Sequence, residues 1–242
     1  MIRRLLKKSE ASEPVQESNA GHNKTYANAS KNADCSEFEV NNWIVSEFIV
    51  DRLVPIVGTH PFPLTELTLM SASVVRFRPK AIFEWGTHIG KSARIFYETA
   101  KAFDIACQVH SFDLPDDVEH VEHPHEQRGE LVRGLPVKLY QEDGVTGALR
   151  ICRKGKISDD KVLFFVDGDH EYGSVKRELA AIAKNHPRAK ILLHDTFYQS
   201  PKSHYNVGPW KAVEEFTKNN KSYKRVSTNT GLPGMTLLYK AK

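Results

Sequence analysis

The stretch Ala81-Ile-Phe-Glu-Trp-Gly-Thr-His-Ile-Gly-Lys-Ser92 decides the fold. A short apolar run at its start has the length of a strand and ends in a carboxylate, Glu84. Gly86 and Gly90 follow, and glycine lets a backbone turn sharply and approach a ligand closely because it lacks a Cβ. Apolar residues then recur at helical intervals, at positions 93, 96, 100 and 103. Strand, glycine turn and helix in this order predict the ligand-binding crevice of an open α/β sheet.

The spacing of the glycines carries information about the ligand. A dinucleotide-binding turn needs the pattern Gly-x-Gly-x-x-Gly, but His88 and Lys91 occupy its second and third glycine positions, counted from Gly86. The spacing therefore argues against NAD and against a nicotinamide-dependent oxidoreductase, which we keep as an alternative. It does not argue against every nucleoside-like ligand.

Four further segments resemble strands, and polar side chains follow each of them. The runs and the residues that follow them are 109–112 with Asp113, 135–140 with Asp143, 162–166 with Asp167, and 189–193 with His194 and Asp195. Five consecutive apolar residues, as in 162–166, indicate a strand buried on both faces of a parallel sheet. A carboxylate only accepts hydrogen bonds, so Asp113 is suited to the two ribose hydroxyls of a nucleoside ligand.

Two motifs resemble a known family. The pattern Glu84-x-Gly-Thr-x-x-Gly-x-Ser92 resembles motif I of class I S-adenosylmethionine (SAM) methyltransferases. The pattern Asp167-Gly-Asp-His170 before a helix resembles the branch with catechol O-methyltransferase-like and macrolide- and cephamycin-tailoring O-methyltransferases. The resemblance covers about 64–240. It implies an α/β fold with a doubly wound, Rossmann-like, seven-stranded sheet, mostly parallel, with an antiparallel C-terminal hairpin and N-terminal helices.

The same resemblance implies a set of cofactor-binding residues. SAM would be held by the glycine turn and by the strand ends, through Glu84, Gly86, Thr87, Gly90, Ser92, Asp113, Asp143 and Asp167. At Asp143 the family has a pair that faces the adenine. Glu142 stands where many relatives have glycine.

A metal site and a catalytic base also follow from the resemblance. In metal-dependent members, carboxylates at the ends of strands four and five hold one Mg²⁺, and Asp167 and Asp195 match two of those positions. His194, which stands where relatives can have a carboxylate, is the third candidate metal residue, and the requirement for a metal stays open. His170 corresponds to the base of catechol-type relatives, and an imidazole can take a proton near neutral pH.

Together these features predict a SAM-dependent methyltransferase that acts on a hydroxyl oxygen of a small molecule or a saccharide, with or without Mg²⁺. The alternative to an enzyme is a non-catalytic SAM-binding module. His120, His123 and His125 lie in a long polar connection, which we interpret as a substrate-side loop rather than a metal site.

Composition limits the partners and the location. The 242 residues have a formal net charge of +4, which does not demand nucleic acid, and an oligomer of identical chains stays open. No run reaches the length of a spanning helix, so stable membrane insertion is not expected. The cysteines, Cys35, Cys107 and Cys152, lie far apart without metal-type spacing, which favours the cytoplasm.

The domain prediction has two parts. Residues 1–36 are polar and without period, which predicts a mobile tail, and 37–242 form one methyltransferase domain with an N-terminal helical layer. Within that layer we expect one helix that ends before Pro55 and a second one capped by Thr65.

Overall fold

The computed structural model describes residues 25–26, 35, 37–115, 118 and 127–241. In this part of the chain seven strands form one sheet in the order β3-β2-β1-β4-β5-β7-β6. They are β1 Ala81–Trp85, β2 Gln108–Asp113, β3 Lys138–Gln141, β4 Val162–Val166, β5 Lys190–His194, β6 Tyr223–Ser227 and β7 Met235–Lys240. The first five run parallel, and β7 pairs antiparallel with both β5 and β6. The predicted sheet and its C-terminal hairpin are confirmed.

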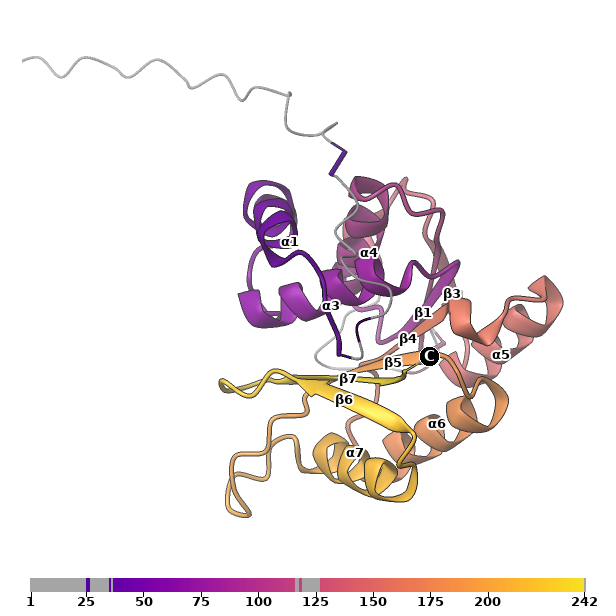
Figure 1. Cartoon of the computed structure of the whole chain (residues 1–242). Coiled ribbons are helices and arrows are strands. Elements are labelled where there is room, and N and C mark those ends of the chain that lie inside the picture. Colours follow the sequence, from indigo (N-terminus) through magenta and orange to yellow (C-terminus); the bar gives the residue numbers. More distant parts are fainter. Residues whose placement is uncertain (1–24, 27–34, 36, 116–117, 119–126, 242) are drawn as a thin grey trace, which may run out of the picture.

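Helices cover both faces of the sheet (Figure 1). One face carries α1 Asn42–Phe48, a π-helix Ile49–Leu53, α2 Val54–Val57, α3 Leu64–Phe77 and α4 Lys91–Ala102. The other carries α5 Gly144–Gly155, α6 Tyr172–Asn185 and α7 Val207–Asn219. Short 3₁₀ turns span Glu130–Val132 and Asp159–Lys161. None of the helices in the described ranges is long and apolar enough to cross a membrane.

The core consists of two apolar layers, one on each face of the central strands. Every residue of β1, β4 and β5 is buried, as the apolar run 162–166 predicted for β4. Successive side chains of a strand point to opposite faces. Leu163 and Phe165 therefore pack toward α3 and α4, while Phe164 packs toward α5 and α6. Full burial of one such side chain contributes about 1.5–3 kcal/mol, and the packing fixes the strand ends rigidly.

The first predicted helix does not end before Pro55, so that boundary is wrong. The chain passes from α1 through the π-helix into α2, which has Pro55 in its first turn. Proline lacks a backbone N–H and is tolerated in the first turn of a helix, where that N–H needs no partner. A buried ion pair of 2.9 Å between Arg52 and Glu98 joins the π-helix to α4.

Two other expectations in the N-terminal part need correction. Thr65 does not cap α3, because the helix begins at Leu64 and Pro63 is the capping residue. Tyr26 lies in the stretch predicted to be mobile, yet it is buried, and its N–H donates to the carbonyl of Ala102 at 2.8 Å. Most of residues 1–36 lies outside the described residues, so the rest of the tail stays a prediction.

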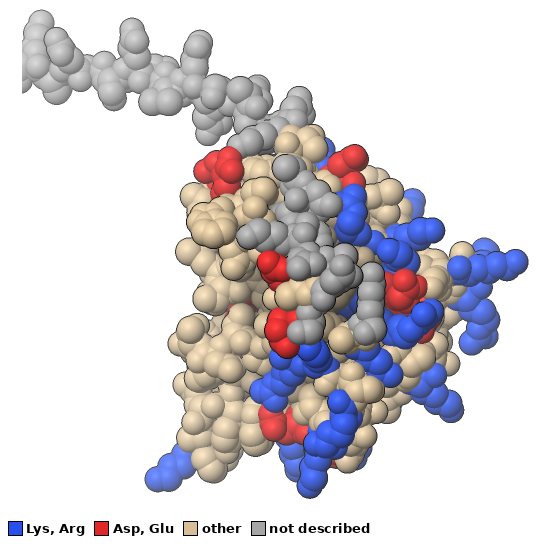
Figure 2. Space-filling view, in the orientation of Figure 1, with Lys and Arg blue, Asp and Glu red and all other residues tan. Residues whose placement is uncertain are grey.

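Charge is spread unevenly over the surface. On the face drawn in Figure 2, Lys and Arg gather on the side that carries α5, while the side of α1 and the β6–β7 hairpin shows fewer of them. The C-terminal turn of α5 contributes Arg153 and Lys154. Although the net charge is modest, one side of the molecule is therefore rich in basic residues.

The start of α7 packs against the loop between β4 and α6. A Cβ on Gly208 would lie 2.1 Å from the carbonyl oxygen of His170 and 2.8 Å from the backbone nitrogen of Tyr172. Backbone atoms cannot yield as a flexible side chain can. Only glycine therefore lets these two segments approach so closely.

We expect Gly208→Ala to lower the free energy of unfolding by about 1–3 kcal/mol, the usual cost of overpacking. Gly173→Ala is the matched control, because a Cβ on Gly173 meets nothing within 4 Å. It should be neutral or stabilising by roughly 0.5–1 kcal/mol, as expected for glycine replaced by alanine in a helix. Urea denaturation of both variants measures the difference, and equal stabilities would contradict the packing.

Candidate active site

The glycine turn after β1 joins the ends of β1 and β4, where the strand order reverses. Gly86 has a φ of +94°, and a Cβ on it would lie 2.1 Å from the carbonyl oxygen of Asp167. Gly90, with a φ of +85°, immediately precedes α4. The crevice of an open α/β sheet lies at such a reversal, so the turn stands where the sequence predicted a ligand.

Glu84 is fully buried under this turn. Its Oε2 accepts a hydrogen bond from the hydroxyl of Ser92, while Oε1 has no partner in hydrogen-bonding geometry within the described residues. Burial raises the pKa of Glu84 to about 8, and the hydroxyls of Ser111 and Ser92 act in the opposite direction. Thr87 shares a hydrogen bond of 2.6 Å with Ser111 and so joins the same polar group. In the SAM-free protein Glu84 therefore holds its proton at neutral pH.

Asp113 stands at the end of β2 and contacts the glycine turn. It accepts backbone hydrogen bonds from His88 at 3.0 Å and from Leu114 at 2.8 Å, and Arg128 Nε lies 3.3 Å from its Oδ2. Each carboxylate oxygen has two lone pairs, so Asp113 can accept further hydrogen bonds. Its role toward a ribose stays a prediction.

Asp143 caps α5. Its Oδ1 accepts the N–H of Thr146 at 2.8 Å, and its Oδ2 lies 3.3 Å from the guanidinium of Arg177. Glu142, the residue that departs from the family pattern, instead pairs with Arg150. These contacts account for Asp143 structurally, and its position next to the adenine stays a prediction.

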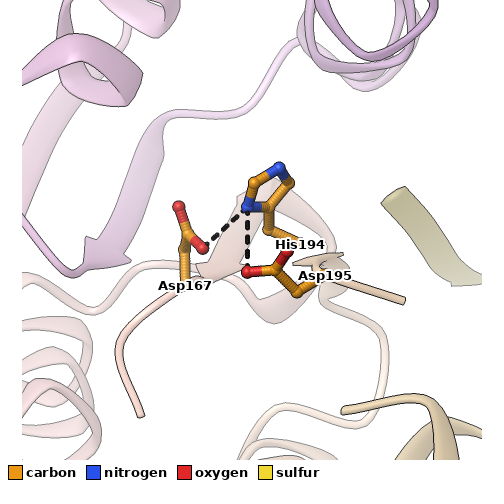
Figure 3. A group of neighbouring side chains, drawn as sticks. All are labelled: Asp167, His194 and Asp195. Carbon is orange, nitrogen blue, oxygen red and sulfur yellow. Dashed lines mark hydrogen bonds and ion pairs between the residues drawn. The ribbon is translucent and has the colours of Figure 1, made fainter. Parts of the chain in front are cut away.

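Asp167, His194 and Asp195 come together at the ends of β4 and β5 (Figure 3). His194 Nδ1 lies 3.0 Å from Asp167 Oδ1 and 3.5 Å from Asp195 Oδ2. One ligand atom from each residue falls within 4.8 Å of the others. The structure thus brings together the three residues that the resemblance assigned to a metal.

The other side of His194 meets the N-terminal helical layer. Its Nε2 lies 3.0 Å from Oε2 of Glu66 on α3, and the ring of Phe62 packs 4.8 Å from its own. Burial alone would lower the pKa of His194, but the charge of Asp167 and the bonds to Asp167 and Glu66 outweigh it. Together they raise that pKa well above its ordinary value.

His170 faces the same carboxylates from the solvent side. Its Nε2 lies 3.1 Å from Asp195 Oδ2 and 3.7 Å from Asp167 Oδ1, while 53% of its side chain is exposed. Interaction with Asp167 raises the pKa of His170, partial burial opposes this, and the charge of Asp195 adds to the rise. The phenol of Tyr205 donates to Asp195 Oδ1 at 3.4 Å. His170 is therefore accessible to an acceptor, which His194 is not.

The second aspartate of the Asp-Gly-Asp-His motif has a structural task. Asp169 accepts the N–H of Glu171 at 2.9 Å and the hydroxyl of Ser174, and it thereby fixes the start of α6. The predicted substrate-side loop with its three histidines lies outside the described residues.

The sequence pointed to most of this cluster but missed Glu66. A glutamate in the first turn of a helix is ordinary, because it is favourable near the positive end of the helix dipole. Glu66 is nevertheless only 1% exposed, and its Oε1 accepts the N–H of Gly234 at 2.7 Å. A single charged residue among the apolar positions of α3 is the only sequence signal that could have found it.

The strand order, the glycine turn and the acidic strand ends together define a class I SAM-dependent methyltransferase. More narrowly, residues 62–235 match the rhamnosyl O-methyltransferase/CmcI family, and the chain belongs to this family. Its members and structural neighbours are SAM-dependent O-methyltransferases, and this protein is an enzyme of that kind. No curated protein sequence matches the chain.

Several solved structures share the fold at low sequence identity. The SAH-bound methyltransferase PaMTH1 of Podospora anserina has a TM-score of 0.53 and 16% identity, covering 80% of this chain and 88% of its own. The O-methyltransferase TomG of Streptomyces achromogenes, in complex with SAM, has a TM-score of 0.52 and 15% identity. The match covers 83% of this chain and 97% of TomG. CalS11, a TDP-rhamnose 3′-O-methyltransferase of calicheamicin biosynthesis, has a TM-score of 0.51 and 16% identity. The match covers 80% of this chain and 86% of CalS11.

We expect Glu84→Gln to remove a pH dependence of stability. Because the pKa of Glu84 rises from 4.5 to about 8 on folding, the folded state keeps a proton that the unfolded chain loses in this window. The wild type should therefore lose stability as the pH rises from about 4.5 to 8, whereas a neutral glutamine should not. One pKa unit corresponds to about 1.4 kcal/mol. The difference in free energy of unfolding between the wild type and Glu84→Gln should therefore change by a few kcal/mol over this pH range. Melting curves of both SAM-free proteins at pH 5 and pH 8 measure it, and a constant gap would contradict the burial of Glu84.

Proposed function

We propose that this enzyme transfers the methyl group of SAM to a hydroxyl of a saccharide or a small organic molecule, with His170 as the general base. The observation that supports this role of His170 is its position: a half-exposed imidazole, 3.1 Å from a buried carboxylate, at the mouth of the predicted SAM crevice. General bases are often imidazoles oriented by a carboxylate in this way.

SAM is a cation, and the crevice offers groups that suit it. Glu84 lies buried under the glycine turn, where the positive charge of a bound ligand nearby would favour its ionised form. Asp113 retains lone pairs for the two ribose hydroxyls. Gly86 and Gly90, with φ values of +94° and +85°, let the turn fold closely against the end of β4 and the segment 129–132.

The chemistry follows from alignment and one proton transfer. SAM supplies a methyl group on a sulfonium, which departs as S-adenosylhomocysteine when the acceptor oxygen takes the methyl carbon. Holding oxygen, carbon and sulfur in line removes most of the entropic barrier. Nδ1 of His170, the ring nitrogen that does not face the carboxylates, accepts the hydroxyl proton, and Asp195, 3.1 Å from Nε2, stabilises the imidazolium that results.

An exposed aromatic side chain borders the cluster. Tyr205 is 50% exposed while its phenol reaches Asp195, and its neighbour Asn206 donates to the carbonyl of Pro233 at 2.6 Å. An aromatic side chain beside polar groups suits an acceptor that combines hydroxyls with an apolar face.

The resemblance further implies Mg²⁺ at Asp167 and Asp195, where a divalent ion would lower the pKa of the acceptor hydroxyl. The donor set fits Mg²⁺ incompletely, because the third group of the cluster is the nitrogen of His194 and Mg²⁺ prefers oxygen ligands. Proton transfer to His170 does not require the ion. The cytoplasmic location and self-association stay predictions.

The SAM site predicts that Asp113→Ala weakens SAM binding at least tenfold, because charge-assisted hydrogen bonds contribute about 1.5–3 kcal/mol each. Isothermal titration with SAM measures the change. Asp51→Ala is the control, since Asp51 is exposed on the π-helix far along the chain from the turn. Unchanged affinity in a folded Asp113→Ala protein would rule out the ribose contact.

The base assignment predicts that His170→Ala lowers turnover by about 10²–10⁴-fold, the usual contribution of a general base. SAM affinity should change little, because His170 serves the acceptor rather than the cofactor. Release of S-adenosylhomocysteine with rhamnosides and catechols as acceptors reports the reaction, and Glu171→Gln is the neighbouring control. A variant with a lower melting temperature but a normal rate would remove His170 from the mechanism.

A further inference from the structure

Arg128 contacts the carboxylate that the sequence assigned to the ribose of SAM. Its Nε lies 3.3 Å from Asp113 Oδ2, and the two side chains are only 12% and 19% exposed. Withdrawing two charges this far from water is costly unless they stay paired. The pair therefore ties Arg128 to the end of β2, across the long connection between β2 and β3.

The contacts around this pair form a closed ring. The oxygen that faces Arg128, Asp113 Oδ2, also accepts the backbone N–H of His88 at 3.0 Å. The carbonyl of His88 in turn accepts the N–H of Gly129 at 2.8 Å. Because Gly129 directly follows Arg128, the ring closes, and each of its contacts helps to fix the others.

The segment that follows Arg128 is fastened to the glycine turn, and we call residues 128–132 the strap. The N–H of Leu131 donates to the carbonyl of Ile89 at 2.9 Å. A Cβ on Gly90 would lie 3.1 Å from the side chain of Val132, which is buried. The strap therefore packs directly on the turn through hydrogen bonds and apolar contact.

The backbone of the turn depends on these contacts. His88 has a φ of +45°, a left-handed conformation that is uncommon for a residue with a Cβ. Such a residue persists when its surroundings hold it, and here the N–H of His88 is bound by Asp113 and its carbonyl by Gly129. The glycines alone therefore do not set the shape of the turn.

The strap is the end of the connection that the sequence analysis interpreted as a substrate-side loop. Arg128, Gly129 and Leu131 reach Asp113 and the glycine turn, and both of these belong to the predicted SAM site. This end of the connection therefore lies on the cofactor side of the crevice.

We propose that the strap is part of the SAM site and that Arg128 positions Asp113 for the ribose hydroxyls. A carboxylate that accepts two hydroxyls at once must hold both oxygens in place, and a side chain fixed before binding loses less freedom when the ligand arrives. Arg128 acts through Asp113 and does not touch the reacting atoms. The inference rests on the ribose contact of the proposed function.

The first experiment is isothermal titration of the full-length protein with S-adenosylhomocysteine. Arg128→Gln should weaken binding roughly tenfold, which lies within the coupling found between contacting residues. Arg133→Gln removes the same charge from an exposed side chain just outside the strap, and it should bind like the wild type. Equal affinity in Arg128→Gln and the wild type would overturn the proposal.

A second ligand separates positioning from a general loss of structure. The 2′,3′-dideoxy analogue of S-adenosylhomocysteine lacks both ribose hydroxyls, so Arg128→Gln should bind it as well as the wild type does. A distorted strap would weaken both ligands, and equal losses for the two would rule out the positioning role. Arg128→Lys covers the case in which Arg128→Gln does not fold, because it keeps the charge but not the fixed geometry of the guanidinium. Its loss should again be confined to the ligand with hydroxyls.

A double variant tests whether Arg128 acts through Asp113. Once Asp113→Ala has removed the carboxylate, adding Arg128→Gln should cause no further loss of affinity for S-adenosylhomocysteine. Losses that simply add would contradict the proposal. Unchanged affinity in Asp113→Ala would refute the ribose contact itself, whereas a loss in Asp113→Ala without one in Arg128→Gln would refute only the role of Arg128.

Discussion

The arrangement of the site depends on the balance of charge at the ends of β4 and β5. Asp167 and Asp195 end neighbouring strands, and two partly buried carboxylates repel each other unless positive charge stands between them. Removing charges from water costs several kcal/mol per ion unless each is paired. The buried imidazole of His194 and the half-exposed imidazole of His170 supply this positive charge, so carboxylates and imidazoles alternate in the cluster.

The neighbouring elements are arranged to hold this alternation. Glu66 brings α3 onto His194, Gly234 at the β6–β7 turn fixes Glu66, and Tyr205 closes the solvent side over Asp195. Asp195 itself adopts a φ of +54°, a left-handed conformation that few residues other than glycine occupy. A strained residue of this kind persists when its surroundings fix it, and such residues concentrate at functional sites.

Much of this could be predicted from the sequence because it depends on local pattern. Apolar runs such as 162–166 define strands, and the carboxyl ends of parallel strands meet at one edge of the sheet, so Asp167 and Asp195 could be expected to lie close together, as they do. The errors have tertiary causes. The helical segment continues through Pro55 because the proline falls in the first turn of α2, where its missing N–H is tolerated. Glu66 was missed because its partner is 128 residues away, and no local pattern reports such a distance.

The two bonds of Glu66 also say something about the order of assembly. They join the third helix to residues 128 and 168 positions further along the chain, and the second of these lies next to the last strand. During synthesis the N-terminal part of a chain emerges first, and contacts across long separations form only after the intervening chain has been ordered. Until the last hairpin has docked, α3 therefore presents a carboxylate without its partners. The contacts that hold Glu66 behind His194 are therefore complete only after the β6–β7 hairpin has formed.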